Sequence, residues 1–375
     1  MKVAIGMRVH HGPWGGGSRF AASLAEHLQQ SGSDVTFDLT DPSLDVILLT
    51  EPRRFSPSCG FNDADILAYL TRVNGRAIVV HRVNECDERK KTRTLNRRLS
   101  RANRCADHTV IISTWLRQLF LSQGYPLIEP TVIRNGASRS VFHSGDAALW
   151  DGREKLRIIT HHWSDNWMKG FDVYSHFDAL LGQAPYRDLF EFTYVGRVPT
   201  NVQFRHVQVL HPLTGPRLAS VLRAHHVYLT ASQNEPAGMH HIEGALCGLP
   251  ILYRRSGALP EYCEGFGLEF DEGTFDTRLL EMRERYSDLK NRMSEYPYDS
   301  ERMCNAYENL FRNLLARREE MLRRRRWTSA SAWKLRMRAS AYDTCHRWLL
   351  AIESSRSRVL GRLTGHDRKT DSGGS

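Results

Sequence analysis

The sequence predicts an α/β protein built from two domains, each organised around a parallel sheet. Short apolar runs alternate with helical patterns along most of the 375 residues, a length that suits two domains of ordinary size. The clearest unit spans 227–253, where an apolar run, a helical run and a second apolar run follow one another. Gly248 and Pro250 close the helical run, as glycine and proline commonly do. Strand, helix and strand in this order form the basic unit of a parallel sheet.

The first domain is expected over residues 1–143. Ser18 is expected to cap a helix whose apolar positions, Phe20, Leu24 and Leu28, lie at helical spacing. Strands and helices then alternate in a Rossmann-like order. The expected strands are 3–7, 35–37, 46–49, 77–80 and 109–112, and further helices are expected at 66–73 and 95–102.

Residues 144–155 are polar and contain glycine, which predicts a hinge between the domains. The second domain is expected over 156–320. Its expected strands are 156–160, 192–195, 206–210, 227–229 and 251–253, and its expected helices are 217–223, 239–246, 279–293 and a last one that begins near 300.

Two carboxylates lie on the unit 227–253, Glu235 in the loop after its first strand and Glu243 inside its helix. Ligands of open parallel sheets bind beyond the carboxyl ends of the strands, so Glu235 is expected at a ligand edge. The helix begins near Gly238 and Met239, where free backbone N–H groups form a ready site for an anion such as a phosphate. These residues are candidates for substrate binding, and Glu235 is also a candidate catalytic residue.

The same carboxylates are followed by Gly248-Leu249-Pro250 and by 257–261, which reads Gly-Ala-Leu-Pro-Glu. The whole string resembles the signature of the retaining glycosyltransferases of the GT-B fold, which use nucleotide-sugar donors. The last turn departs from that signature by one extra residue between Gly and Pro. The resemblance implies two Rossmann-like domains that face each other across a cleft, with the last helix crossing back onto the first domain. It also implies that Glu235 holds hydroxyls of the donor sugar and that Glu243 holds the ribose hydroxyls.

Two features of the first domain fit this resemblance. A glycine-rich loop that ends in Gly16 and Gly17 lies between the first strand and the first helix, an arrangement suited to a phosphate. His81 follows the expected strand 77–80 and could hydrogen-bond a sugar hydroxyl. The family carries a histidine at the matching strand end, often followed by Asp, where this chain has Arg82. We therefore expect His81 to be a catalytic residue, and Gly16 and Gly17 to bind substrate.

The diphosphate of the donor requires positive charge, which the family usually supplies with a Gly-Arg pair followed by Lys-Gly. Lys169-Gly170 matches the second pair, so Lys169 is a candidate catalytic residue. His162-Trp163-Ser164 stands where Gly-Arg is expected. Arg197, after the strand 192–195, and Arg8, in the first loop, are candidates to supply the missing charge.

We expect no bound metal and no cofactor besides the nucleotide-diphosphate sugar. Adjacent histidines at 161–162 and 240–241 rarely hold one ion together, and the resembling fold uses none. Asp63 and Asp65 open a helix, where acids are favoured by the helix dipole, so they are expected to cap it. Seven cysteines without a CxxC pair suit reduced thiols, and neither a secretory signal nor an apolar run of eighteen residues is visible. A cytoplasmic protein is expected.

Basic charge gathers in residues 321–375, which contain thirteen Lys/Arg and four Asp/Glu and so carry nine of the ten net positive charges. Apolar residues from Trp333 to Ile352 recur every three or four positions between basic ones. A basic amphipathic helix of this kind suits an anionic membrane surface, expected for 323–363 at the inner membrane face. A helix packed on the body and a disordered or nucleic-acid-binding end are the alternatives. No nucleic-acid motif accompanies the charge, so nucleic acid is not an expected partner.

The resemblance implies a retaining glycosyltransferase that moves a sugar from a nucleotide-diphosphate sugar to a glycan or lipid-linked glycan, in polysaccharide or surface glycan synthesis. No protein nucleophile is evident, so the leaving phosphate is expected to take the proton of the acceptor. Two other readings remain open. One is a nucleotide-sugar epimerase or glycoside phosphorylase on the same fold, and the other is a non-catalytic scaffold that binds glycan or membrane.

Overall fold

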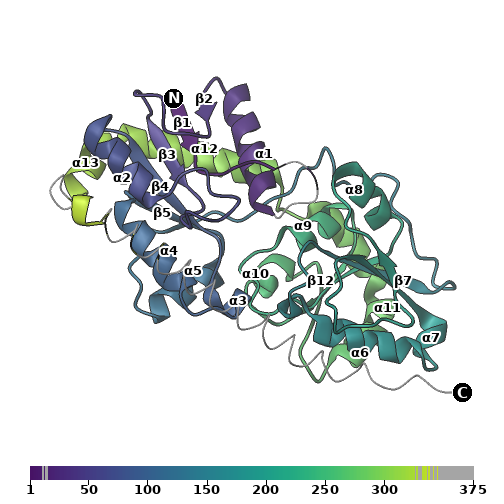
Figure 1. Ribbon diagram of the computed structural model, residues 1–375. Coiled ribbons are helices and arrows are strands. Elements are labelled where there is room, and N and C mark those ends of the chain that lie inside the picture. The colour runs from purple at the N-terminus through teal and green to yellow at the C-terminus, as the bar shows by residue number, and fades with distance from the viewer. Residues whose placement is uncertain are drawn as a thin grey trace, which may run out of the picture.

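The computed structural model describes residues 1–10, 12, 16–325, 327, 332–335, 337, 341 and 344. These residues form two lobes side by side, each with a six-stranded sheet and flanking helices (Figure 1). Every strand pairing in both sheets is parallel. The predicted α/β class with two Rossmann-like domains is therefore confirmed.

The N-terminal sheet has the order β2-β1-β3-β4-β5-β6. Its strands are β1 (Lys2–Ile5), β2 (Asp34–Thr36), β3 (Val46–Leu49), β4 (Ile78–Val83), β5 (His108–Ile111) and β6 (Thr131–Val132). Its helices are α1 (Gly16–Gln30), α2 (Asp63–Arg72), α3 (Asp87–Lys90), α4 (Leu95–Ala102) and α5 (Thr114–Ser122). The chain reverses its direction across the sheet between β1 and β3, and parallel sheets bind ligands beyond the strand ends at such a point.

The C-terminal sheet has the order β12-β11-β10-β7-β8-β9, so the direction reverses between β7 and β10. Its strands are β7 (Leu156–His162), β8 (Phe190–Gly196), β9 (Gln208–Leu210), β10 (Val227–Thr230), β11 (Ile251–Arg254) and β12 (Gly267–Phe270). Its helices are α6 (Phe171–Leu181), α7 (Tyr186–Leu189), α8 (Gly215–Arg223), α9 (Met239–Leu246), α10 (Leu259–Cys263) and α11 (Phe275–Arg292). The carboxyl ends of β7 and β10 lead directly to Lys169 and Glu235.

Two final helices, α12 (Ser300–Ala316) and α13 (Arg318–Arg324), return to the N-terminal lobe, where α12 lies against α1 (Figure 1). Tyr307 of α12 packs on Phe20 of α1, with ring centroids 5.2 Å apart. Both belong to a buried apolar cluster together with strand residues of the N-terminal sheet. The crossing that the resemblance implied is therefore present, and residues 300–324 pack on the first domain although they follow the second.

Hydrogen bonds join α10 of the second domain to the segments that follow β5 and β6 of the first domain. Tyr262 donates from Oη to the carbonyl of Ile112 at 2.8 Å and accepts from the amide of Asn135 at 2.9 Å. The carboxylate of Glu261 accepts from the amide of Thr114 at 2.8 Å and from Arg134. These contacts hold the two lobes together at one side of the space between their sheets.

Some boundaries differ from those expected. Ser18 does not cap α1 but lies inside its first turn, buried, where its Oγ accepts a hydrogen bond from His10. The strand that begins at Ile78 does not end before His81 but continues to Val83. Asp65 forms a capping box with Asn62, as the capping interpretation of the acids at 63 and 65 predicted.

The first part of the basic tail packs on the N-terminal domain. The side chain of Arg325 is 8% exposed and pairs with Asp107 at 2.7 Å, and Ala332 is fully buried in an apolar cluster of that domain. Trp333 and Met337 are 62% and 55% exposed. The rest of the apolar stripe, from Cys345 to Ile352, lies outside the described residues. Within the part of the chain that the structure describes, no helix has the length and apolar composition to cross a membrane.

Candidate active site

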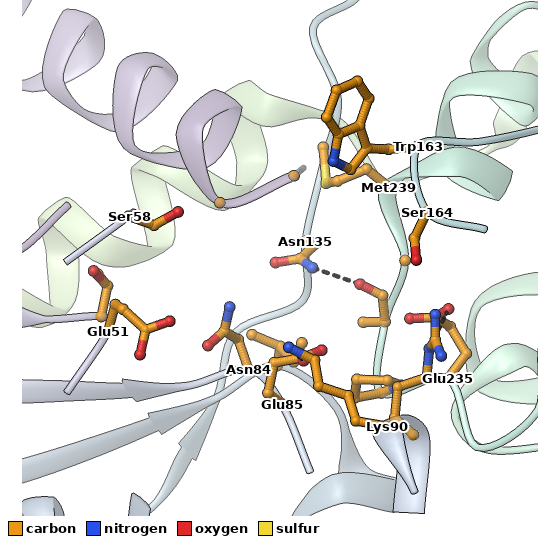
Figure 2. A pocket seen from close by; sticks show the side chains of 18 of the residues that line it. Glu51, Ser58, Asn84, Glu85, Lys90, Asn135, Trp163, Ser164, Glu235 and Met239 are labelled. Carbon is orange, nitrogen blue, oxygen red and sulfur yellow. Dashed lines mark hydrogen bonds and ion pairs between the residues drawn. The ribbon is translucent and has the colours of Figure 1, made fainter. Parts of the chain in front are cut away.

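A cavity of about 560 Å³ lies between the two domains and is lined by both. Figure 2 shows Glu51, Ser58, Asn84, Glu85 and Lys90 of the N-terminal domain on one side of it. Trp163, Ser164, Glu235 and Met239 of the C-terminal domain line the opposite side. The cavity therefore lies beyond the strand ends of both sheets, where their direction reversals place a ligand site.

Glu235 is a buried carboxylate of this cavity that is held by cations of both domains. Its Oε2 accepts from Lys169 Nζ at 2.9 Å and from Arg89 Nε at 3.2 Å, and only 4% of the residue is exposed. Burial by itself would raise the pKa of Glu235, but the charges of Lys169 and Arg89 outweigh burial and hold that pKa well below its ordinary value. Glu235 is therefore a carboxylate between two cations, one from each domain.

Lys169 reaches Glu235 because two loops are tied together. Lys169 ends a short 3-10 helix (Trp167–Lys169) after β7, and the amide of Gln233 donates to the carbonyl of Met168 at 2.8 Å. Burial lowers the pKa of Lys169 from 10.5 to about 8, although the adjacent Glu235 opposes that shift. The ammonium group is thus charged at neutral pH and titrates within two pH units of it.

The N-terminus of α9 lies directly beside Glu235. A Cβ built on Gly238, the N-cap residue, would stand 3.2 Å from Cδ of Glu235. No side chain caps this helix end, so its first amide groups are available to an anion. Gly238 and Met239 line the cavity together with Gly16 and Gly17, so the four residues expected to bind substrate lie at one cavity. Gly16 approaches so closely that a Cβ there would lie 2.6 Å from Cγ of Met239.

Glu243 is placed differently from Glu235. It is fully buried and does not line the cavity. His161 donates from Nε2 to Oε2 of Glu243 at 2.9 Å. Nη1 of Arg19 lies 2.8 Å from Oε1 of Glu243 and forms an ion pair with it, but the geometry of this contact is not that of a hydrogen bond. Burial raises the pKa of Glu243, but Arg19 and His161 together lower it below the ordinary value. Glu243 is thus a buried carboxylate with a partner at each oxygen, and a ribose contact there would require Arg19 to move.

A small recess of about 30 Å³ opens beside these partners. It shares four residues with the large cavity and continues into an apolar loop after β9. The shared residues are Arg19, His161, His162 and Trp163, and the loop contributes Pro212, Leu213 and Thr214. The recess is therefore an extension of the cavity toward the C-terminal domain, with a flat indole ring at its mouth.

His81 and the proposed substitutes for the missing arginine do not lie where they were expected. His81 is fully buried within β4, donates from Nδ1 to Oδ1 of Asn103 at 2.9 Å, and does not line the cavity. Its ring meets Asn103 at the end of α4, and β4 continues past it for two residues. Arg197 stacks over the ring of Trp163 at 4.2 Å, outside the cavity wall, and Arg8 is exposed outside it.

The four histidines at 161–162 and 240–241 form a buried polar layer, and all of them except His241 line the cavity. His162 pairs with Tyr174 Oη at 2.8 Å and His240 with Thr230 Oγ1 at 2.9 Å. Burial lowers the pKa values of His162 and His240, so both rings are neutral at pH 7. Within the described ranges, no group of three His, Cys, Asp or Glu side chains is placed to hold a metal ion.

The N-terminal side of the cavity contains residues that the sequence patterns did not single out. Arg89 and Lys90 belong to the short helix α3, and Arg19 to α1. The available signal was the dense run of charges from 82 to 90, directly after the carboxyl end of a strand. A run of charged residues after a strand is commonly a turn exposed to solvent. That this run faces a cavity is evident only from the packing of α3 against the second domain.

The fold is that of known glycosyltransferases. No family model matches the sequence, and no curated protein matches it. HepE from Anabaena, solved with UDP and glucose, superposes with a TM-score of 0.59 at 16% identity, covering 84% of this chain and 100% of that chain. HepE has also been solved with UDP-glucose. Sucrose-phosphate synthase from Thermosynechococcus elongatus gives a TM-score of 0.58 at 14% identity, covering 84% and 99%.

A glycosyltransferase from Rickettsia africae gives a TM-score of 0.56 at 11% identity and covers 84% of this chain and 98% of that one. Likeness at such low identity establishes the architecture. The chain therefore has the GT-B fold that the sequence resemblance implied, with two Rossmann-like domains facing each other across a cleft.

Proposed function

We propose that the protein is a glycosyltransferase that moves a sugar from a nucleotide-diphosphate sugar to a hydroxyl of an acceptor, with retention at the anomeric carbon. The observation that carries this proposal is the position of Lys169, 2.9 Å from Glu235 beside the uncapped N-terminus of α9 on the cavity wall. A cation and a set of free amide groups together stabilise the negative charge of a departing diphosphate.

The lining of the cavity suggests how a donor would lie. Its diphosphate would meet Lys169 and the amides of Gly238 and Met239, and its sugar would meet Glu235. The nucleoside would extend toward the recess, where Trp163 and Leu213 offer apolar surface to a base. HepE, which shares the fold, was solved with UDP and with UDP-glucose, which supports a uridine nucleotide as the first donor to test.

In the proposed step, the bond between the anomeric carbon and the β-phosphate oxygen breaks, and its electron pair remains on the phosphate. The acceptor oxygen bonds to the anomeric carbon on the same face, and its proton passes to the departing phosphate oxygen. The protein supplies orientation and charge rather than a nucleophile. Glu235, held as an anion, would fix the sugar hydroxyls and favour positive charge as it develops on the ring.

The acceptor would enter from the N-terminal side, where Glu51, Asn84 and Glu85 line the cavity. These polar groups suit a hydroxyl-rich acceptor such as a glycan or a lipid-linked glycan. A membrane-bound acceptor would also fit the exposed pair Trp333 and Met337, which stand four residues apart beside the exposed Lys334.

The test is a screen of UDP-, GDP- and dTDP-sugars for binding, by thermal shift, and for release of the nucleoside diphosphate. We expect one donor to bind and to be turned over slowly by water. Lys169→Met should reduce turnover by about 100-fold or more, as loss of a charge that stabilises the leaving group does. An epimerised donor, or turnover that depends on inorganic phosphate, would instead support an epimerase or a phosphorylase. Binding without any turnover would support the scaffold interpretation.

A further inference from the structure

The proposed diphosphate site contains one cation from the C-terminal domain, Lys169. In GT-B enzymes that resemble this chain a Gly-Arg pair adds a second cation, but His162-Trp163-Ser164 occupies that place. The charge must come from elsewhere if a diphosphate is to be neutralised. The cavity lining contains six cationic side chains, of which five come from the N-terminal domain: Arg19, Arg53, Arg82, Arg89 and Lys90.

Four of these five are committed to other partners. Arg53 pairs with Glu51 at 2.5 Å, and Lys90 pairs with Glu85. Arg19 pairs with the buried Glu243 at 2.8 Å. Arg82 donates from Nη2 to Asn135 at 2.8 Å and lies over the ring of Phe20 at 3.9 Å, and its Nε and Nη1 have no hydrogen-bond partner among the described residues but are buried. None of these four contacts Glu235.

Arg89 is the exception, because it and Lys169 bind the same oxygen atom of Glu235. Its Nε and the Nζ of Lys169 both donate to Oε2 of Glu235, at 3.2 and 2.9 Å. Among the described residues, Nη1 and Nη2 of Arg89 have no hydrogen-bond partner, although the side chain is 7% exposed and lines the cavity. Two parallel donors of a guanidinium match the spacing of two phosphate oxygens.

We propose that Arg89 is the second cation of the diphosphate site, and that it reaches the donor from the opposite domain. This inference rests on the proposed function, since it names a further residue for the same donor. Glu235 holds Nε of Arg89 and so orients the fork, while Nη1 and Nη2 bind the phosphates. The clamp is then divided between the domains, with Lys169 and α9 on one side and Arg89 on the other.

The segment that carries Arg89 is rigid enough for this role. The carboxylate of Asp87 accepts hydrogen bonds from Thr92 Oγ1 and from the amides of Leu95 and Asn96, at 2.5 to 2.9 Å. The amide of Asp87 in turn donates to Oδ1 of Asn96 at 2.8 Å. These bonds fix α3 against the start of α4, so that Arg89 is held across the cavity without a long flexible loop.

A divided clamp has a functional consequence. Positive charge at the diphosphate is complete only while the domains face each other as they do here. A donor that binds the C-terminal domain alone would meet Lys169 and the α9 amides but would lack Arg89. Departure of the diphosphate would therefore be favoured after closure, when water is excluded from the cavity.

The experiment measures binding of inorganic pyrophosphate by calorimetry to the full chain and to the variants Arg89→Gln and Arg89→Lys. Pyrophosphate reports the diphosphate site without assuming which nucleoside or sugar the donor carries. Arg134→Gln is the matched control, because Arg134 also pairs with a carboxylate across the domains, Glu261 at 2.8 Å, but does not line the cavity. Thermal unfolding of each variant checks that it folds.

We expect Arg89→Gln to weaken pyrophosphate binding by about 10- to 100-fold, as loss of charge-assisted hydrogen bonds does. Arg89→Lys should recover part of the loss, and Arg134→Gln should bind as the unmodified chain does. If Arg134→Gln weakened pyrophosphate binding equally, Arg89 would act through the domain interface, and the inference would be wrong. Unchanged pyrophosphate binding by Arg89→Gln, or no binding by the unmodified chain, would also overturn it. Arg89-dependent binding without turnover of any nucleotide sugar would leave this site standing and refute only the proposed function.

Discussion

Arg19 of the first domain, which lines the cavity, and Glu243 of the second form an ion pair of 2.8 Å across the domains. The two ends of this pair differ in solvent access, because Glu243 is fully buried and the Arg19 side chain is 34% exposed. Removing either partner should therefore have unequal effects, since an unpaired buried charge costs far more than an unpaired exposed one.

We predict that Arg19→Met lowers the free energy of unfolding by about 3 kcal/mol, because it leaves the Glu243 carboxylate buried with His161 as its remaining partner. Glu243→Gln should lower it by only about 1 kcal/mol, since the amide can still bond His161 and Arg19 can turn to water. Urea unfolding of both variants measures the difference. A larger loss for Glu243→Gln than for Arg19→Met would contradict this account.

The pH dependence of turnover should report Lys169. Burial lowers its pKa to about 8, so the ammonium charge that would stabilise the leaving diphosphate is lost as the pH rises through that value. We predict that kcat/KM falls above about pH 8, and that Lys169→Arg, if active, moves this fall to higher pH. Burial also lowers the pKa of Lys90 to about 8. Lys90→Arg is therefore the control. If this variant, and not Lys169→Arg, shifted the decrease of kcat/KM to higher pH, the decrease would report the titration of Lys90 instead.

The close approach of Gly16 to Met239 gives a prediction about shape. A Cβ at residue 16 would meet the Cγ of Met239 at 2.6 Å, so Gly16→Ala must displace the first turn of α1 from the start of α9. We expect weaker donor binding and a loss of stability of about 1 to 3 kcal/mol, as overpacking commonly causes. Met239→Ala should relieve the clash in the double variant. A double-mutant cycle measures this, and strictly additive losses would show that the two residues do not interact.

Glu261 ends the Gly-Ala-Leu-Pro-Glu turn and caps α5 of the other domain. Its carboxylate accepts from the amides of Thr114 and Trp115, at 2.8 and 3.3 Å. We predict that Glu261→Ala destabilises the protein by about 1 to 2 kcal/mol, the usual cost of losing an N-terminal cap. The neighbouring exposed Glu264 gives the control variant Glu264→Ala, which should change the melting temperature little. Equal shifts for both variants would refute a capping role for Glu261.

A membrane contact through the tail can be tested with vesicles. Trp333 and Met337 are exposed, whereas Ala332 is buried against the first domain. We predict that the full chain sediments with vesicles containing phosphatidylserine but not with phosphatidylcholine alone, and that Trp333→Gln with Met337→Gln reduces this binding several-fold. Leu121→Gln, at an exposed leucine of α5, is the matched control. Unchanged sedimentation of the double variant would argue that the contact, if any, lies elsewhere.

The fold class, most strands and the C-terminal half of the candidate site could be predicted from the sequence alone. The residues of that half of the site are close together in the chain, because Glu235, Gly238 and Met239 lie within ten residues on one strand–helix unit. Lys169 follows the neighbouring strand. The acids at the start of α2, Asp63 and Asp65, were also predicted, since their favourable interaction is with the dipole of the helix that they open.

Which residues of the first domain face that unit depends on how the two domains pack against each other. His81 was expected at a strand end, but two more residues pair in β4, and a side chain inside a strand points to whichever layer covers it. Arg89 and Arg19 lie 146 and 224 residues from their carboxylate partners, so no local pattern could connect them. The sequence placed the donor-side groups because they are neighbours in the chain, whereas their partners across the cavity were settled by how the two domains pack.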